Sequence, residues 1–492
     1  MFTRRPSWLP RALLFGSMTI WLFLVARMVV IRHNTFFTFD FDLGIHDQSL
    51  WLLANGKWFN TVCGLPVFGH HASFMYLLLV PLVWIGAGPN VWNLIQVCAL
   101  GFSAIPVFLI AHNRLRSELH ATIFGIAWLL LPTTTYLAWE TFHPETMAVP
   151  FLLMAYHSCT VRKSSLPAVS MRRNISSMSW VVGAILWKED LALALIGLGI
   201  LLIFRRRPLF GSIMIVCATT YFVIVGLWLP PHLSGGPTAY EMLYGDLGST
   251  PKELISTLFN DPSRFLDRAT ENNILGYFAR LASPLSFLSV LAPLTLLMGA
   301  PQFFINILTN SDFTWSQMFH YQAVPLAVSI TSAIEGFALL KRRVPRLANC
   351  AMVVLATTVL TSAYAWGILP HATNAYSMDD LVAQDGGGWR LALDRIGPND
   401  GISAHYNFVP HVTHREVVYT FPNPWLRSNF LSDASAFVDE CEIRWIVVEP
   451  EALDSDSQNL LKSLVARGKY NEIDTLAGVS IYEYSGPPCA GP

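Results

Sequence analysis

Long apolar runs recur along the chain, separated by short polar segments. A run of about 20 apolar residues is long enough for a helix that crosses the hydrocarbon core of a bilayer. Runs near this length predict spanning helices at residues 12–31, 89–111, 120–138, 144–161, 209–229, 274–297, 320–340 and 347–369. The pattern therefore predicts an all-α polytopic membrane protein.

Basic residues between these runs indicate which loops face the cytoplasm, because short cytoplasmic loops are enriched in Lys and Arg. The basic clusters lie at residues 4–5, 114–116, 162–173, 205–207 and 341–346. If all are cytoplasmic, residues 176–204 must leave and return to one side, as a hairpin of two short helices that meet at Lys188-Glu189-Asp190. A single long span with three charges near its centre is the alternative, but it breaks the charge pattern.

The same argument makes residues 300–308 a short return segment and predicts about 11 crossings, with a cytoplasmic N-terminus. The first external loop covers about residues 32–88. Within it, the apolar segment 72–86 is too short for a span, which favours an interfacial or re-entrant helix. The chain then divides into a transmembrane domain, residues 1–369, and an external domain, residues 370–492.

The external domain has a different pattern. Segments 401–405, 417–421, 445–449 and 479–484 are short, rich in β-branched and aromatic residues, and bounded by Gly, Pro, Asn or Asp, which is typical of strands. Helical periodicity appears at residues 389–396 and 458–467. We therefore expect a small α/β domain, in which no segment resembles a catalytic motif.

Composition agrees with a membrane protein. The chain is 53% hydrophobic and 13% charged, with a mean hydropathy of +0.43, which excludes an ordinary soluble domain. The basic N-terminus resembles a signal peptide, but its apolar run is long and no small-x-small cleavage site follows, so we expect an uncleaved first span. The net charge of −1 indicates no particular partner, and no nucleic-acid partner is expected.

The seven cysteines say little about function. Most lie in or near spans, where cysteine behaves as a small apolar residue. Cys63, Cys441 and Cys489 are predicted to be external, so one disulfide between two of them is an option and one thiol is left over. Whether Cys441 and Cys489 form that bond stays open. The sequence has no C-x-x-C pair and no zinc-type spacing.

Unusual polar residues gather at the predicted outer ends of the spans, whereas the cytoplasmic loops are basic and have no such acidic clusters. The polar residues are Asp40, Asp42, Asp47 and Gln48, His70 and His71, Glu140, His143 and Glu145, Lys188, Glu189 and Asp190, and His320 and Tyr321. Ionisable residues at a membrane are costly to keep there and mark functional sites. This distribution predicts a site on the external face.

Such a carboxylate-rich site with a few cations suits glycosyl transfer from a lipid-linked sugar phosphate. The donor phosphate lies near the interface, where Lys188, Arg280 or a histidine could hold it. A carboxylate base takes a proton from the acceptor hydroxyl as the anomeric carbon gains positive charge. A polyprenyl-phosphate leaving group is already charged, so it needs cation contacts more than protonation.

Several motifs also resemble a known family. The segment FDLGIHDQ at residues 41–48, followed by Trp51, resembles the FDLGIxDQxxW signature of a bacterial membrane-protein family assigned to the GT-C glycosyltransferase superfamily. The resemblance extends to FHPE at 142–145, KED at 188–190, HY at 320–321, THR at 413–415 and YTFP at 419–422. It therefore covers nearly the whole chain.

The resemblance implies a GT-C architecture in the bacterial plasma membrane, a polyprenyl-phosphate sugar donor, and a lipid, glycan or protein acceptor outside the cytoplasm. It also implies a catalytic Asp in the first external loop. By position this base is Asp42, with Asp40 and Asp47 as rivals, and transfer is expected to invert the anomeric carbon. One position departs from the expected pattern, because Thr141 stands where a more polar or acidic residue is expected, so Glu140 is a candidate for that role.

The remaining candidates are assigned to substrate binding. They are Gln48, Trp51, His71, His143, Glu145, Lys188, Glu189, Asp190, His320 and Tyr321. The candidate residues also have structural alternatives. Asp40 or Asp42 could cap the helix that starts near Leu43. Residues 47–48 could form a solvated face, 188–190 an external turn, and 320–321 an aromatic belt. A divalent cation is an option for the Asp and His groups, although no spacing demands one.

Two other classes of protein fit parts of the pattern. A secondary transporter has internal repeats and polar residues near the membrane midplane, whereas here no repeat is evident and the polar residues gather at one face. A membrane scaffold with an external binding domain would not need the clustered acids. The sequence therefore favours the glycosyltransferase.

Overall fold

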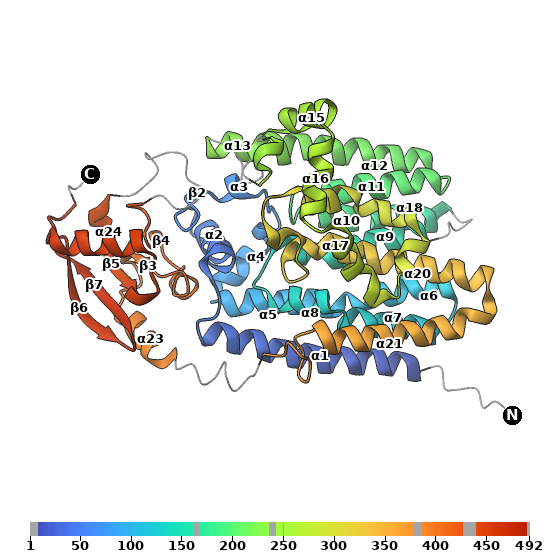
Figure 1. Ribbon diagram of the computed structural model, residues 1–492, viewed down its shortest axis with the longest axis horizontal. Helices are drawn as coiled ribbons and strands as arrows, with labels where there is room; N and C mark the ends of the chain where they lie inside the picture. The colour runs from blue at the N-terminus through green and yellow to red at the C-terminus, as the bar shows by residue number, and fades with distance from the viewer. Residues whose placement is uncertain are drawn as a thin grey trace.

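A helical bundle and a small sheet domain lie one after the other along the long axis of the molecule (Figure 1). The computed structural model describes residues 8–161, 167–235, 243–248, 250–376, 386–426 and 439–489. The basic cluster at residues 4–5 and part of the cluster at 162–173 lie outside these ranges. The helices of the bundle follow the predicted apolar runs closely at most positions.

Most long runs form helices near the predicted bounds. They are α1 (Leu9–Asn34), α5 (Pro89–Phe102) with α6 (Ala104–Leu115), α7 (Glu118–Leu130) with α8 (Pro132–Trp139), α9 (Pro144–Thr160), α12 (Pro208–Tyr221) with α13 (Leu229–Ser234), α20 (Ala323–Arg343) and α21 (Ala348–Trp366). Helices α7 and α8 meet at a 48° bend, where Pro132 cannot continue the hydrogen-bond ladder.

Several of these helices can cross a membrane. Among the described residues, five are long and apolar enough, or six if α7 and α8 together make one span. Shorter apolar helices lie at Ile175–Ile185, Leu191–Phe204 and Pro293–Leu308. The chain is therefore a membrane protein with a mostly helical fold, while the number of about 11 crossings stays a prediction.

The hairpin predicted at residues 176–204 is present. Helices α10 (Pro167–Ile185) and α11 (Leu191–Phe204) are separated by a short turn that contains Lys188 and Glu189. Close packing of α11 on α12 explains two glycines, because a Cβ on Gly199 or Gly211 would lie 2.9 Å or less from the backbone of the other helix. The alternative of one continuous span over these residues is therefore wrong.

The helix predicted at residues 274–297 is not continuous. The structure has α17 (Ile274–Ala282), two short 3-10 turns and α18 (Pro293–Leu296), followed by the expected short helix α19 (Ala300–Leu308). Pro284 and Pro293 remove backbone donors, and Ser286 and Phe287 adopt left-handed φ angles of 53° and 55°, which no α-helix can include. An apolar run alone did not reveal these breaks.

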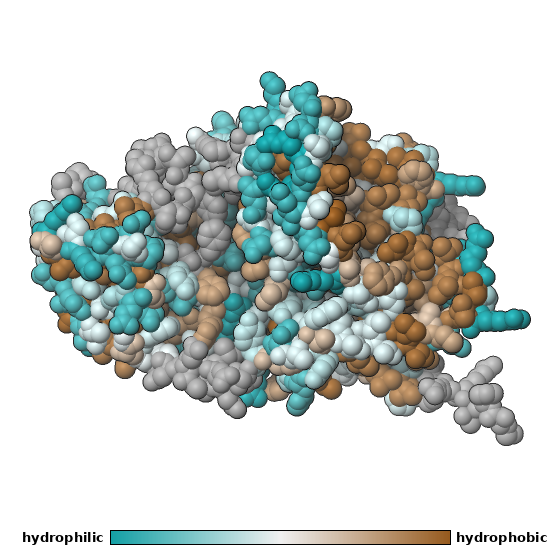
Figure 2. Space-filling model, viewed as in Figure 1, coloured by the Kyte–Doolittle hydropathy of each residue, from teal (hydrophilic) through white to brown (hydrophobic). Residues whose placement is uncertain are grey.

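The surface of the bundle matches a membrane environment. Figure 2 shows hydrophobic side chains over the part of the bundle that lies away from the sheet domain. Exposed Phe204, Leu209 and Val216 on α11 and α12 belong to this apolar surface. Hydrophilic side chains cover the sheet domain, the short helices α15 (Pro251–Asn260) and α16 (Ser263–Glu271), and the far edge of the bundle. Such an apolar band between two polar ends is expected of a membrane-spanning bundle.

The C-terminal residues form the predicted small α/β domain. Its strands are β3 (Gly401–Ala404), β4 (Val418–Thr420), β5 (Ile443–Val448), β6 (Tyr470–Leu476) and β7 (Val479–Tyr484), in the order β4-β3-β5-β7-β6. The β3 strand pairs in parallel with β4 and β5, whereas the β5-β7 and β7-β6 pairs are antiparallel. Helices α23 (Gly386–Leu393) and α24 (Ser455–Ala466) accompany the sheet. Strand β6 was missed because it is a polar, largely exposed edge strand.

Two of the three cysteines that were predicted to be external form a disulfide in the described part of the structure. Cys441 and Cys489 form a disulfide in the sheet domain, and Cys63 is a buried thiol. The bond joins the segment before β5 to the segment after β7, so it closes the end of the sheet domain.

The boundary between the two domains is less simple than the division at residue 369 suggests. Phe36, Ile45 and Val62 from the first loop share one buried hydrophobic cluster with Ile402 and Val418 of the sheet. The first loop therefore contributes to the core of the sheet domain, and the two parts are joined by packing as well as by the chain.

Candidate active site

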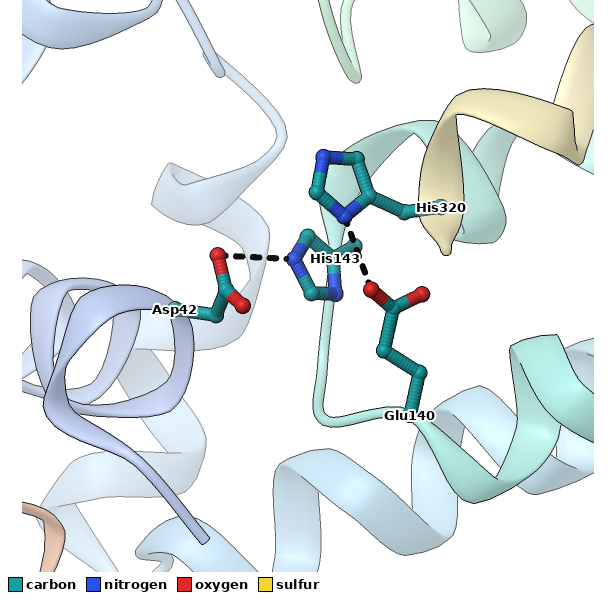
Figure 3. A group of neighbouring side chains, drawn as sticks. All are labelled: Asp42, Glu140, His143 and His320. Carbon is teal, nitrogen blue, oxygen red and sulfur yellow. Dashed lines mark hydrogen bonds and ion pairs between the residues drawn. The ribbon is translucent and has the colours of Figure 1, made fainter. Parts of the chain in front are cut away.

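Four side chains from three distant parts of the chain converge at one end of the bundle (Figure 3). The Asp42 Oδ1 atom lies 3.0 Å from His143 Nε2, and Glu140 Oε1 lies 3.0 Å from His320 Nδ1. The two imidazole rings stack with centroids 3.8 Å apart. Two histidine–carboxylate pairs are thus placed side by side.

Local breaks in the helices present these residues. Asp42 lies in a π-helical turn, Asp40–Gly44, directly before α2 (Ile45–Ala54). His143 is extended, with φ −139° and ψ 134°, because Pro144 begins α9 and proline disfavours a helical residue before it. His320 lies in a 3-10 turn before α20. Gly44 is the N-cap residue of α2, so Asp42 does not occupy that position, whereas the side chain of Asp40 lies outside the described part of the structure.

Two amides on α5 hold the break between α8 and α9. Gln96 donates through Nε2 to the carbonyls of Leu137, Glu140 and Thr141, and its Oε1 accepts from the backbone N–H of His143 at 2.7 Å. Asn93 Oδ1 accepts from the N–H of Phe142. The sequence argument missed both amides, although polar residues three apart in an otherwise apolar span are a signal.

A second layer of charges lies behind the four residues. Lys188 Nζ contacts Glu145 Oε1 at 2.7 Å and Asp190 Oδ2 at 3.7 Å, and Glu145 Oε1 lies 3.5 Å from His320 Nε2. Glu189 accepts from His71 Nδ1 at 2.8 Å and from the backbone N–H of Ala72 at 3.0 Å. The triplet 188–190 is therefore a largely buried turn whose charges are paired beside the four residues, and its role in substrate binding stays a prediction.

Attraction within the site shifts the pKa values of its groups. Burial alone would lower the pKa of His143, but Asp42, Glu140 and Glu145 raise it to about 10. Burial alone would raise the pKa of Asp42, but attraction to His143 lowers it well below the usual value. Burial raises the pKa of Asp190 to about 7 against the opposing effect of Lys188. In this arrangement Asp42 is a carboxylate that faces an imidazolium.

Asp42 is the accessible member of the group. Its side chain is 30% exposed, whereas that of His143 is 3% exposed and that of Lys188 is 5% exposed. A substrate that reaches the site from outside the bundle therefore meets Asp42 first. The side chain of Asp40 lies outside the described part of the structure.

Asp47 and Gln48 lie in a different environment. The fully buried Asp47 carboxylate accepts from Trp92 Nε1 at 2.5 Å and from Thr413 Oγ1, and it pairs with His414 Nε2 at 3.2 Å. Gln48 is also fully buried and contacts Thr61 and the backbone of the 415–416 segment. The solvated face considered for residues 47–48 is therefore wrong.

These contacts bring together two motifs that lie far apart in the sequence. The motif at 41–48 provides Asp47 and Gln48, and the motif at 413–415 provides Thr413 and His414, which contact Asp47. Arg415 donates to the carbonyls of Val412, Gly397 and Asp400, which fixes the segment that carries these partners. Both motifs meet where the sheet domain contacts the bundle.

His46 and the remaining candidates lie in different environments. His46 shares a hydrogen bond with Tyr76, and its ring centroid lies 5.6 Å from that of His143. The His70 and His71 rings contact each other, and Tyr321 packs on His320 with ring centroids 4.1 Å apart. Trp51 is partly buried and packs against the bundle core. Arg280 is exposed on α17.

The contact between His414 and Asp47 predicts a pH-dependent stability. Burial opposes protonation, but the hydrogen bond and attraction to Asp47 raise the pKa of His414. Because the folded pKa is raised, its stabilisation is complete below pH about 6.5 and is lost as the pH rises through the folded value. We expect Tm to fall over this range by a small amount, since the His414 side chain is 40% exposed.

Thermal unfolding of the full chain between pH 5.5 and 9 measures this effect. The variant His414→Gln should lose that part of the pH dependence. An unchanged profile in His414→Gln would contradict the assignment.

Comparison with solved structures defines the class of fold. The chain is similar to a crystal structure of ArnT from Cupriavidus metallidurans bound to undecaprenyl phosphate, with a TM-score of 0.58, 12% identity, and coverage of 95% of this chain and 97% of that one. The apo structure of the same ArnT gives a TM-score of 0.53 and 13% identity, with coverage of 94% and 98%. This protein therefore has a fold similar to that of ArnT.

The family follows from the sequence. Residues 32–479 match the family of predicted membrane proteins DUF2079, and the chain belongs to that family. No curated protein shows a significant match to it in sequence.

Proposed function

We propose that this protein is a membrane glycosyltransferase that moves a sugar from a polyprenyl-phosphate donor to a lipid, glycan or protein acceptor outside the cytoplasm. The observation that carries the proposal is the partly exposed carboxylate of Asp42, held 3.0 Å from the buried His143 at one end of an ArnT-like bundle. The fold supports the donor class, since one similar ArnT structure is bound to undecaprenyl phosphate.

Asp42 is the general base in this proposal. It takes the proton of the acceptor hydroxyl while that oxygen forms a bond to the anomeric carbon. The bond between the anomeric carbon and the phosphate oxygen breaks, and its electron pair leaves with the polyprenyl phosphate. Direct displacement from the opposite face inverts the anomeric centre. His143 positions Asp42 and keeps it ionised.

The cation contact to the donor phosphate needs a separate assignment. Lys188 is buried and already contacts Glu145 and Asp190, so moving it to a phosphate would leave buried carboxylates without their cation. We assign Lys188 to positioning Glu145. Arg280, which is exposed on α17, can contact a phosphate without breaking such a pair.

The arrangement favours transfer at an interface over transport through the bilayer. Glu145 lies in the first turn of α9, and at the other end of this 17-residue helix an arginine-lined cavity of about 410 Å³ includes Arg114, Arg205 and Arg207. Roughly 25 Å of helix separates the two ends. An acidic site at one end and a basic one at the other match the predicted external and cytoplasmic faces, whereas transporter sites lie near the midplane.

A test starts from the purified full-length chain in lipid nanodiscs. We expect it to bind undecaprenyl phosphate, and we expect a strain without the protein to accumulate a polyprenyl-phosphate sugar that the purified protein converts to undecaprenyl phosphate when membranes supply an acceptor. The proposal would be overturned if the protein bound no undecaprenyl phosphate and the strain without it accumulated no polyprenyl-linked sugar.

A further inference from the structure

We propose that Asp42, Glu140, His143 and His320 together bind one divalent transition-metal ion. Each residue offers one ligand atom, and these atoms all lie within 4.8 Å of one another. An ion with four ligands at about 2.1 Å separates its ligand atoms by roughly 3.4 Å in tetrahedral geometry. In the structure, two of the distances between ligand atoms are 3.0 Å and none exceeds 4.8 Å, so the expected spacing lies within this range. Small side-chain shifts would bring all four atoms to the distance of a bound ion.

The polar contacts of the two histidine rings match those of metal ligands. A ligating histidine usually donates its other ring N–H to a carbonyl or a carboxylate, which fixes the tautomer and turns the remaining lone pair to the metal. His143 Nδ1 lies 2.6 Å from the carbonyl oxygen of Thr141, which leaves Nε2 to face Asp42 and the centre of the group. His320 Nε2 lies 3.5 Å from Glu145 Oε1, which leaves Nδ1 to face Glu140.

The backbone arrangement makes this pattern specific. Gln96 holds both the Thr141 carbonyl and the His143 N–H, so the acceptor for His143 Nδ1 is fixed independently of any side chain in the group. Glu145 is likewise fixed by Lys188 at 2.7 Å. Both outer partners are therefore built into the bundle, as the supporting shell of a metal site requires.

The charge balance of the site also calls for a cation. Glu140 is buried, and its Oε2 has no hydrogen-bond partner within the described part of the chain. Around it, the described side chains include two cations, Lys188 and Arg32, the latter attracted to Glu140 and Asp42, against the carboxylates of Asp42, Glu140, Glu145, Glu189 and Asp190. Buried carboxylates are stable when a cation or a metal offsets them. A divalent ion supplies that charge.

The donor set selects the kind of metal. Two imidazole nitrogens with two carboxylate oxygens suit Zn²⁺ and neighbouring first-row ions, whereas Mg²⁺ and Ca²⁺ prefer all-oxygen sites. One part of the inference rests on the proposed function: an ion beside the partly exposed Asp42 would offset the charge of a departing polyprenyl phosphate in a site that is otherwise acidic.

The experiment measures metal binding itself. The full-length protein is purified in detergent, freed of metal with a chelator, and titrated with Zn²⁺ and with Mg²⁺ by calorimetry. We expect one Zn²⁺ per chain and far weaker Mg²⁺ binding. Glu140→Gln and His320→Asn should each weaken Zn²⁺ binding by more than the roughly 100-fold that loss of an outer partner costs. Co²⁺ should give a visible spectrum in the parent that both variants lose.

His71→Asn is the matched control. It removes a second histidine–carboxylate pair, His71 with Glu189 at 2.8 Å, that lies outside the four ligands, so Zn²⁺ affinity should not change. Zn²⁺ should also raise the Tm of the parent and of His71→Asn but not that of the ligand variants, because a ligand stabilises only the fold that binds it. Comparing Tm values of the metal-free forms shows whether each variant is folded.

Three results would overturn the inference: no saturable Zn²⁺ binding, full binding retained by both folded ligand variants, or an equal loss in His71→Asn. The metal-site inference and the proposed function can fail independently. If the protein transfers sugar but binds no metal, only the metal-site inference fails. If it binds one Zn²⁺ tightly but neither binds undecaprenyl phosphate nor affects polyprenyl-linked sugars, only the proposed glycosyltransferase function fails.

Discussion

Asp42→Asn is expected to lower the turnover of sugar transfer by about 100- to 10,000-fold, the range that general-base catalysis contributes. Asparagine has nearly the same shape as aspartate, so the turn at Asp40–Gly44 can keep its conformation. Its amide cannot accept the proton of the acceptor hydroxyl. Because Asp42 is partly exposed, the substitution should change stability much less than activity.

Transfer is measured as release of undecaprenyl phosphate in nanodiscs, with binding of undecaprenyl phosphate as the check that the variant is folded. Asp246→Asn is the control, because Asp246 is an exposed carboxylate that pairs with Arg264 and Arg268 away from the site. A folded Asp42→Asn that transfers sugar at the parental rate would remove Asp42 as the base. Asp40→Asn tests the rival: loss of transfer in that variant alone would move the assignment to Asp40.

Asp47→Ala is expected to destabilise the protein by about 3–5 kcal/mol, the cost of removing one partner from a buried charged contact. Asp47 is fully buried. The substitution would leave Trp92 Nε1 and the Thr413 hydroxyl without their acceptor and His414 without its counter-charge. Since these partners come from α5 and from the sheet domain, the loss should weaken the contact between the domains.

Thermal unfolding and limited proteolysis of the full chain measure this effect, with earlier release of the sheet domain as the expected result. Thr413→Val provides a graded comparison, because it removes one hydrogen bond to the carboxylate at a cost of about 1.5–3 kcal/mol. If Asp47→Ala kept the parental stability but lost transfer, Asp47 would be catalytic and the structural assignment would fail.

Short-range patterns accounted for much of the fold. Apolar runs located α1, α9, α20 and α21 because a membrane helix needs little more than length and hydrophobicity. The charges at residues 188–190 correctly predicted the turn between α10 and α11. The prediction of one continuous helix at residues 274–297 failed because proline and left-handed residues interrupt the helix without making the run less hydrophobic.

The candidate site was harder to predict because its contacts are long-range. The sequence singled out Asp42, His143 and His320, but Glu140 and His320 are 180 positions apart, and no local pattern pairs such residues. The amides of Asn93 and Gln96, which position the break before His143, were overlooked inside an apolar span.

By itself the sequence determined a membrane protein with several apolar helices, a small C-terminal α/β domain and a set of polar residues gathered at the ends of its helices. It placed Asp42 and Asp47 five positions apart in one motif as candidate bases, and it favoured Asp42 by its position in that motif alone. Only the tertiary structure separated them, since Asp42 faces His143 and remains partly exposed while Asp47 is enclosed by Trp92 and the sheet domain. The physical reason is that the environment of a carboxylate depends on which distant surfaces pack against it, and hydrophobicity along the chain carries no record of that.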